Sequence, residues 1–524
     1  MSEIKKKPSL RKSALTTGLM TGISRISGLL RDVCFSQFFG ASANMDSFFV
    51  AFKIPNLLRR FFAEGAFSQS FVPIINEYKE LHPEKVRDLV GSTFGSLSLI
   101  LFFITALGVV IAPILVYLFA PGFSGNDGQL LITTQMLRYC FPYILFISLT
   151  SLLGSLLNSY GNFLVPAITP VILNLCLIIG AIYLSSWFHP PELGLAVAVF
   201  FAGLFQLIFQ LPFVIRKKLT FRPRINFSYP GVRKIYKLML PGIFGSSVAQ
   251  INILIDTLLA SFLVTGSISW LYYSDRLMEF PLGVFGIAVA TVILPKLSSD
   301  NASDNTEEFK KSFTWGINAV ITIGLPSTMG IILIGDHLLY AIFFSANFNL
   351  HDVSMAYASL VAYSIGLLAF MLIKILVTGY YSRQDTKTPV RFALYSLFLN
   401  ISLNLFFIFI LYRFVGEALH AGLALATSCA ALFNVYLLYR ELIRIRAIDS
   451  GVIFNVHNAK KVLATMIMSA SIIISKSYFI PNPYFMERLS VIFNLSLIIL
   501  IACLVYGVIW HLFIHQDSSL QARD

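Results

Sequence analysis

The sequence predicts an all-α integral membrane protein of about 14 transmembrane helices, arranged as two pseudo-symmetric six-helix lobes followed by two further helices. Of its 524 residues, 56% are hydrophobic and only 12% are charged, whereas soluble proteins have about 25% charged residues. The 48 Phe and 22 Tyr exclude a disordered chain, because such side chains do not stay solvated. The apolar runs are long and continuous, which favours membrane helices over the short alternating strands of a barrel.

Turn residues divide the apolar sequence into segments of membrane-spanning length. Pro121–Gly122 and Pro481–Pro483 are examples, and the polar segments Ser298–Glu308 and Ser382–Pro389 are predicted to be solvated loops. The predicted helices cover residues 13–39, 44–76, 86–119, 129–158, 161–186, 192–215, 232–265, 268–298, 306–335, 352–382, 389–411, 418–440, 458–476 and 488–514.

The charge distribution predicts the orientation of these helices. The net charge is +13, and with the N-terminus in the cytoplasm the basic loops all lie on that side. These loops are Lys79–Arg87, Arg216–Lys234, Lys296–Lys311, Arg383–Arg391 and Arg440–Lys461. The opposite side has only Arg413, Lys476 and Arg488. We therefore expect both termini in the cytoplasm. We attribute the positive net charge to these cytoplasmic loops and not to nucleic-acid binding.

A weak internal repeat predicts the two lobes. Phe48–Phe49 and Pro73 in the second helix correspond to Tyr272–Tyr273 and Pro295 in the eighth. Two-lobed repeats are typical of transporters, whose binding site lies where the repeats meet. The predicted boundaries are 1–220 for the N-terminal lobe, 221–445 for the C-terminal lobe, and 446–524 for the last two helices and a cytoplasmic tail.

Charged residues lie inside several predicted helices, where each costs about 2.5–3.5 kcal/mol on insertion scales. Those in helices 1 and 2 are Arg25, Arg31, Asp32, Asp46, Lys53, Arg59, Arg60 and Glu64, and those in the second lobe include Asp275, Arg276, Glu279 and Lys374. One interpretation is internal pairing, since the spacing of Asp46, Lys53 and Arg60 places them on one helical stripe. The other is a water-filled cavity that binds a ligand.

Arginines dominate the basic members of this set, and arginine presents a planar fork that suits phosphate and carboxylate groups. Arg25 lies about 18 Å along helix 1, and Arg276 about 12 Å from the outer end of helix 8. Pro55 is expected to break helix 2, which leaves open whether Arg59 or Arg60 faces a cavity. The candidate binding residues for an anionic substrate are Arg25, Arg31, Asp46, Lys53, Arg59 and Arg276, with supporting charges at Asp32, Arg60, Glu64, Asp275 and Glu279.

Asp256 is an isolated acid in the seventh helix, about 13 Å from its outer end. It is either a hydrogen-bonded structural residue or a coupling site for Na⁺ or H⁺, to which Asn400 and Asn404 could add oxygen ligands. Neither a nucleotide-binding motif nor a GxSxG nucleophile motif occurs, and the histidines and cysteines form no ligand cluster. We therefore expect a transporter without a bound cofactor, and not an enzyme.

Three segments resemble the MurJ (MviN) family of lipid II flippases, which belongs to the multidrug/oligosaccharidyl-lipid/polysaccharide exporter superfamily. They are the long run from Arg25 to Glu80, the segment GSISWLYYSDRLMEFPLGVFGIAVATVILPKLS at Gly266–Ser298, and YYSRQDTKTPV at Tyr380–Val390. The similarity extends over the first twelve predicted helices, and the last two match only in hydropathy.

The resemblance implies a function for the candidate residues. The family flips lipid II, an undecaprenyl-pyrophosphate-linked disaccharide-pentapeptide, to the outer leaflet of the bacterial plasma (inner) membrane by alternating access. By position in the motifs, the cavity arginines of the family fall on Arg25, Arg31, Arg59 and Arg276, and the outer-end acid of helix 2 falls on Asp46. Family members differ at the position of Asp256, so ion coupling stays open. The implied partners are lipid II, membrane lipids and proteins of cell-wall synthesis.

Three alternatives remain at this point. A multidrug cation exporter of the same superfamily shares the architecture, but it would need an acidic cavity. A flippase for another undecaprenyl-pyrophosphate-linked glycan would recognise the same pyrophosphate. A scaffold of the cell-wall synthesis complex would use the buried charges only for structure.

Overall fold

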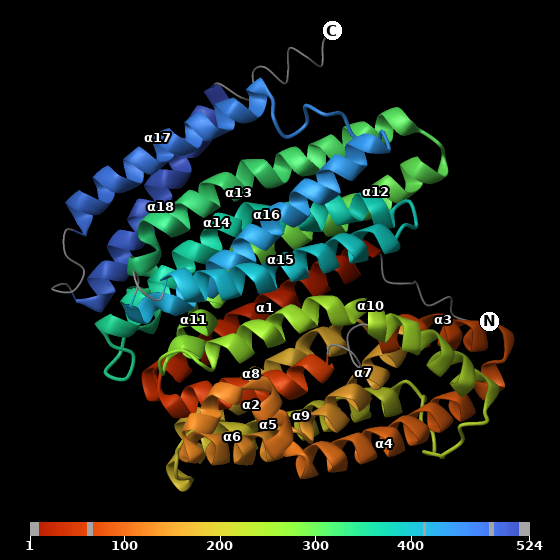
Figure 1. Cartoon of the computed structure of the whole chain (residues 1–524). Helices are drawn as coiled ribbons and strands as arrows, with labels where there is room; N and C mark the ends of the chain where they lie inside the picture. Colours follow the sequence, from red (N-terminus) through yellow and green to blue (C-terminus); the bar gives the residue numbers. More distant parts are fainter. Residues whose placement is uncertain (1–9, 60–65, 412–415, 481–486, 513–524) are drawn as a thin grey trace. The chain divides into compact units, whose positions relative to one another are not determined.

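The computed structural model describes residues 10–59, 66–411, 416–480 and 487–512, and every regular element within these ranges is helical (Figure 1). This confirms the predicted all-α membrane class. The chain divides into two compact units, Met1–Ile268 and Ser269–Asp524. The division predicted at residues 220 and 445 stays a prediction, and each unit is described by itself.

The first unit is built from ten helices in its described residues. They are α1 (Leu10–Phe38), α2 (Ala43–Arg59), α3 (Ala66–Leu81), α4 (Val86–Val110), α5 (Ala112–Phe119), α6 (Asp127–Cys140), α7 (Tyr143–Ser159), α8 (Leu164–Ile182), α9 (Leu193–Arg216) and α10 (Pro230–Ala260). In this unit α1 packs on α8, α2 on α6, α7 on α9, and α10 on α3. Aromatic side chains such as Phe48, Phe49 and Phe67 are fully buried between these helices.

The second unit is formed by α11 and the helices after it. They are α11 (Ser267–Pro281), α12 (Ile287–Ala302), α13 (Thr306–Phe343), α14 (Leu350–Tyr381), α15 (Lys387–Leu411), α16 (His420–Arg444), α17 (Val456–Phe479) and α18 (Arg488–Trp510). α14 packs against α13 and α16, and α17 and α18 lie beside each other and beside α13 (Figure 1). Asn349 and Asp352 form a reciprocal capping box that begins α14.

Proline explains where predicted single helices are interrupted. The predicted helix 86–119 is divided into α4 and α5, and Pro113 lies in the first turn of α5. Pro142 separates α6 from α7, and a π-helical turn (Leu282–Gly286) follows Pro281 between α11 and α12. A proline has no N–H to continue the ladder, so the helix restarts or widens there.

The expected break of helix 2 at Pro55 is wrong. Instead α2 is helical through Pro55 as far as Arg59, the last described residue of this segment. Proline in a membrane helix is tolerated where neighbouring groups satisfy the backbone. The helical phase from Asp46 to Arg59 is therefore continuous.

Eleven helices in the described part of the chain are long and apolar enough to cross a membrane. They correspond to eleven of the fourteen predicted spans, so the count of fourteen is not confirmed. The three other predicted segments, 13–39, 44–76 and 232–265, are helical over α1, α2 with α3, and α10. These segments contain most of the embedded charged residues.

Candidate functional site

Arg31 and Asp32 form a buried ion pair on α1. The Arg31 Nε and Nη2 atoms donate to Asp32 Oδ1 at 2.9 and 2.7 Å, and Nη1 donates to Asn174 Oδ1 of α8 at 3.0 Å. Asn174 in turn donates to Ser27 Oγ at 2.9 Å. Both charged side chains are at most 9% exposed. The positive charge of Arg31 is therefore already compensated by its neighbour in sequence.

Arg25 lies on the same helix in a different environment. Its side chain is exposed, and it forms no ion pair within the described ranges. Arg25 and Arg31 are six residues apart, so they lie about 9 Å apart along the helix axis. Of these two arginines on α1, Arg25 is the one whose guanidinium is available to an added anion.

The acid at the start of α2 anchors a turn. Asp46 is buried, and its Oδ2 accepts a hydrogen bond from the backbone N–H of Gly266 at 2.7 Å. Gly266 has a φ of +94°, which favours glycine, and precedes α11. Two turns further along the same face of α2, Lys53 Nζ donates to Thr257 Oγ1 of α10 at 3.1 Å. The two candidate residues Asp46 and Lys53 thus connect α2 to α10 and to the turn that follows it.

The remaining candidates of α2 are at its end. Arg59 is half-buried, and its Nε donates to Asn56 Oδ1 at 2.8 Å, one turn earlier. The supporting residues Arg60 and Glu64 lie outside the described residues. The stripe predicted for Asp46, Lys53 and Arg60 can therefore be followed only as far as Lys53.

Two of the candidate residues of α11, Arg276 and Glu279, form a local ion pair. Arg276 Nη1 donates to Glu279 Oε2 at 3.0 Å, and the Arg276 guanidinium lies 4.7 Å from the centre of the Tyr272 ring. Both partners are more than a third exposed, and Asp275 is half-buried. Within α11 this arrangement follows the spacing i, i+3.

Asp256 is half-buried on α10 and receives a long hydrogen bond of 3.5 Å from Asn252 Nδ2. It directly precedes Thr257, the partner of Lys53. Asn400 and Asn404 belong to the second unit, where Asn404 Nδ2 donates to Asn400 Oδ1 at 2.9 Å and Asn400 Nδ2 donates to Thr427 Oγ1 at 3.1 Å. Within the described ranges, no three His, Cys, Asp or Glu side chains are grouped as a metal site. The role of Asp256 in coupling stays a prediction.

A groove of about 640 Å³ lies between α12 and α14 in the second unit. Its lining includes Lys374, two hydroxyl residues, Thr291 and Thr378, and the aromatic Tyr381. Lys374 is the embedded base of the predicted tenth helix. Both hydroxyls donate to carbonyls of their own helices, Thr291 to Ile287 at 2.8 Å and Thr378 to Ile375 at 2.6 Å. The ammonium group of Lys374 is therefore the feature of this groove that suits an anionic group.

The loop with the sequence SRQDTKTP is held by its own polar contacts. Asp385 Oδ1 accepts hydrogen bonds from the backbone N–H groups of Lys387 and Thr388, both at 3.0 Å, at the start of α15. Burial alone would raise the pKa of Asp385, but the hydrogen bonds from Thr388 and Lys387 and the charge of Arg391 lower it below its ordinary value. Arg383 stacks on Phe309 at 4.6 Å, and burial lowers its pKa. The SRQDTKTP segment therefore has a structural role in the loop that precedes α15.

Sequence reasoning missed a row of polar contacts that attaches α17 and α18 to α13. Lys461, expected at a helix end, is buried and donates to the Asn318 carbonyl at 3.3 Å. Tyr506 Oη donates to the carbonyl of Thr322 at 2.7 Å. That carbonyl lies four residues before Pro326, which has no N–H to bond it. A proline inside an apolar run was the one available signal for such a contact.

Two further contacts hold the other end of the same surface. Lys476 Nζ bonds both oxygens of Asp336 at 3.1 and 3.2 Å. Arg488 donates to the carbonyls of Ala341 and Ile342 at 2.9 and 2.7 Å, in the last turn of α13. Helix C-terminal carbonyls have no partner within the helix and favour a cation. The sequence alone had placed Lys476 and Arg488 only as flanking charges.

Comparison with known proteins points to one family. Residues 35–495 match the family model described as "Lipid II flippase MurJ". The chain is 46% identical over 450 residues to a probable lipid II flippase MurJ of Vibrio cholerae, covering 84% of each chain. It is 37% identical over 441 residues to the lipid II flippase MurJ of Burkholderia cenocepacia, covering 83% of this chain and 84% of that one.

Solved structures are similar to most of the chain. A lipid II flippase MurJ in an inward closed conformation has a TM-score of 0.80 and 26% identity, covering 96% of this chain and 99% of that one. An inward-facing multidrug resistance MATE transporter of the MOP superfamily has a TM-score of 0.65 at 13% identity, covering 83% of this chain and 99% of that one. The second likeness concerns the fold alone.

Proposed function

The chain belongs to the MurJ family of lipid II flippases, and from this premise we propose that it moves lipid II from the cytoplasmic to the outer leaflet of the bacterial plasma membrane. The single observation in the structure that supports this proposal is the contrast on α1. Arg31 is buried against Asp32, whereas Arg25 is exposed and available to an added anion. The pyrophosphate of lipid II is such an anion.

The chemistry of the substrate explains the need for exposed cations. A multiply charged pyrophosphate cannot cross hydrocarbon without compensation, because burial of an unpaired charge is prohibitively costly. Arginine gives forked, charge-assisted hydrogen bonds to phosphate. In the first unit we assign this contact to Arg25 and Arg59. In the second unit, taken by itself, Arg276 and Lys374 are the candidate anion contacts. The polyprenyl tail stays in lipid.

The proposed cycle is alternating access between inward-open and outward-open states. The membrane potential, negative inside, favours outward movement of the anionic head group. A cation that returns inward would reset the empty carrier, and Asp256 with Asn252 is the proposed place for Na⁺ or H⁺. With both termini in the cytoplasm, the basic loops lie on the side where lipid II enters.

The proposal is tested by reconstituting the purified chain in liposomes with labelled lipid II in the inner leaflet and an imposed potential. Exposure of lipid II to an external modifying enzyme is followed over time. We expect Arg25→Ala to abolish exposure, while the matched control Arg440→Ala, at an exposed arginine near the end of α16, retains it. Normal flipping by Arg25→Ala would sink the assignment of the pyrophosphate contact.

Two other functions would give different results in the same assay. A flippase for another undecaprenyl-pyrophosphate-linked glycan would leave lipid II in place but expose its own substrate in an Arg25-dependent way. A scaffold of cell-wall synthesis would expose neither lipid, and cells with the Arg25→Ala variant would grow while deletion strains would not.

A further inference from the structure

The segment between α9 and α10, residues 217–229, lies as an extended strap along α4. The N–H of Arg224 donates to the Gly91 carbonyl at 3.0 Å, and the N–H of Asn226 donates to Ser96 Oγ at 3.1 Å. A methyl group at Gly91 or Gly95 would overlap the backbone of Arg222 or Arg224. The two glycines therefore allow the backbone of the strap to contact the backbone of α4. A linker that did not pack on α4 would not require glycine at these positions.

Side chains fix the strap at further points. The Phe221 and Phe94 rings lie 5.2 Å apart between centres, and Arg87 Nη2 donates to the Lys218 carbonyl at 3.3 Å. The strap thus follows α4 from its first turn to its middle. Its position on this helix is built into the sequence of both partners.

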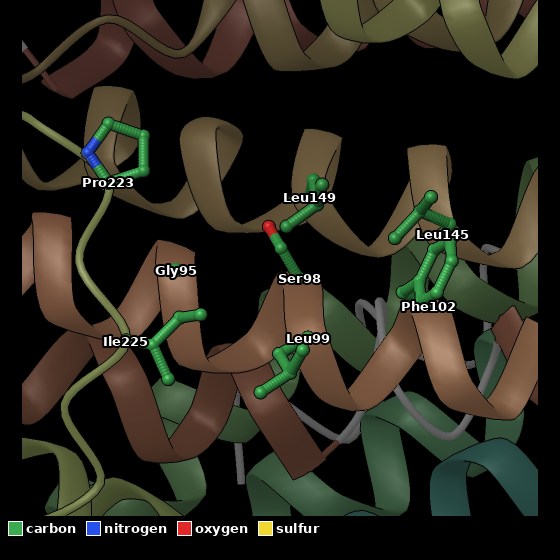
Figure 2. A pocket seen from close by; sticks show the side chains of 8 residues that line it. All are labelled: Gly95, Ser98, Leu99, Phe102, Leu145, Leu149, Pro223 and Ile225. Carbon is green, nitrogen blue, oxygen red and sulfur yellow. The ribbon is translucent and has the colours of Figure 1, made fainter.

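A pocket of about 490 Å³ opens between the strap, α4 and α7 (Figure 2). Pro223 and Ile225 of the strap close one end, and apolar side chains of the two helices form the walls. These wall residues are Leu99 and Phe102 of α4 and Leu145 and Leu149 of α7. Both α4 and α7 belong to candidate membrane spans. We therefore expect this apolar pocket to lie at the depth of the lipid acyl chains.

The strap also has basic residues next to the two residues that close the pocket. The strap, residues 217–229, has four basic residues and no acidic one. Arg222 and Arg224 are exposed and flank Pro223. Arg224 Nη1 forms an ion pair with Asp88 Oδ1 of α4 at 3.4 Å, whereas Arg222 forms no ion pair with any described residue. An apolar pocket bordered by a strap with exposed arginines is complementary to an anionic amphiphile.

We propose that the strap and pocket bind one anionic phospholipid of the cytoplasmic leaflet, with an acyl chain along Leu99 and Phe102 and its phosphate on Arg222 and Arg224. The predicted orientation places this loop at the cytoplasmic surface, where anionic lipids attract Lys and Arg. The bound lipid fills the space between strap and helices and so holds the connection from α9 to α10. The site is separate from the Arg25 contact for the pyrophosphate.

Native mass spectrometry of the purified full-length chain tests this site by titration with phosphatidylglycerol and, separately, phosphatidylcholine. We expect one tightly held phosphatidylglycerol, and Arg222→Gln with Arg224→Gln should weaken it at least about tenfold. Arg444→Gln with Arg446→Gln, at exposed arginines of the second unit, is the matched control and should leave it unchanged. Ile225→Trp, which places a large side chain in the pocket mouth, should reduce phosphatidylglycerol retention to the level of phosphatidylcholine.

Equal retention by the double variant and the parent chain would overturn the proposal. Loss of lipid II binding in that variant would also overturn it, because the pocket would then be a substrate site and not a phospholipid site. The thermal unfolding midpoint of each variant shows whether the fold is intact. Because the readout is lipid retention, its result is independent of whether the chain flips lipid II.

Discussion

The polar helices α1, α2 and α10 of the first unit and the α17–α18 hairpin of the second unit handle membrane-embedded charges differently. In the first unit the charges lie within helices and are compensated by side chains such as Asp32 and Asn174, or by a backbone N–H such as that of Gly266. In the hairpin, Lys476 and Arg488 lie near helix ends and bond to α13. After Arg488 the helix α18 has no further Asp, Glu, Lys or Arg, and only 17% of its most apolar part is buried inside the protein.

This difference shows that the position of a charged residue along its helix determines which groups compensate it. A charge at a helix end has orphan carbonyls of a neighbouring helix within reach, so it serves attachment. A charge in the middle of a helix, such as Arg31, cannot use the backbone of its own helix and is kept where a side chain or a ligand compensates it. Charges available for transport are therefore expected in α1 and α2 rather than in the hairpin.

The largest loss of stability is expected when the Arg31–Asp32 ion pair of α1 is broken. Asp32→Ala leaves Arg31 buried without its carboxylate, and removing one partner of a buried pair costs about 3–5 kcal/mol. The unfolding midpoint in detergent should fall strongly. The double variant Arg31→Met with Asp32→Leu should recover most of the stability.

Flipping by that double variant sharpens the assignment of Arg31. If Arg31 contacts the pyrophosphate, the stable double variant does not flip lipid II. Full flipping would restrict Arg31 to the structural role that its contacts with Asp32 and Asn174 indicate.

An intermediate effect is expected from detaching the hairpin. Lys476→Met leaves the half-buried carboxylate of Asp336 with fewer donors, which costs about 1–3 kcal/mol. Protease sensitivity near residues 480–487 and the unfolding midpoint should both report this loss. Lys476→Arg is the control, since it keeps the charge, and an equal loss in both variants would show that the ion pair is not what attaches the hairpin.

A smaller effect follows from the contact at the proline of α13. Tyr506→Phe removes the hydrogen bond to the Thr322 carbonyl and should cost about 1 kcal/mol. In a Pro326→Ala background the alanine N–H can bond that carbonyl, so the same substitution should cost less. A double-mutant cycle without coupling would contradict this account.

The smallest effect is expected at the loop end of α15, which lies in neither region. The pKa of Asp385 is lowered, so its contribution to stability is present above its unfolded value of about 3.9 and is lost as the pH falls through the folded value. Asp385→Asn should cost about 0.5–1 kcal/mol at neutral pH and nothing in acid. Unfolding midpoints measured between pH 7 and pH 3 check this, and a pH-independent difference would be the contrary result.

Much of this protein follows from its sequence. Apolar runs of spanning length determine an all-α membrane protein, since lipid leaves the backbone no partner outside a helix. Three motifs are sufficient to indicate the family, and the excess of charge in the first two helices marks the candidate site. Local pairs such as Arg276 with Glu279 follow from helical spacing alone.

Only the tertiary structure decided which charges are already compensated. Asn174 lies 143 residues from Arg31, and Gly266 lies 220 residues from Asp46, so no spacing could reveal either contact. The same is true of the strap on Gly91 and Gly95 and of Tyr506 on the Thr322 carbonyl. The physical reason is that a hydrogen bond depends on distance in space, whereas hydropathy and helical period report only on neighbours along the chain.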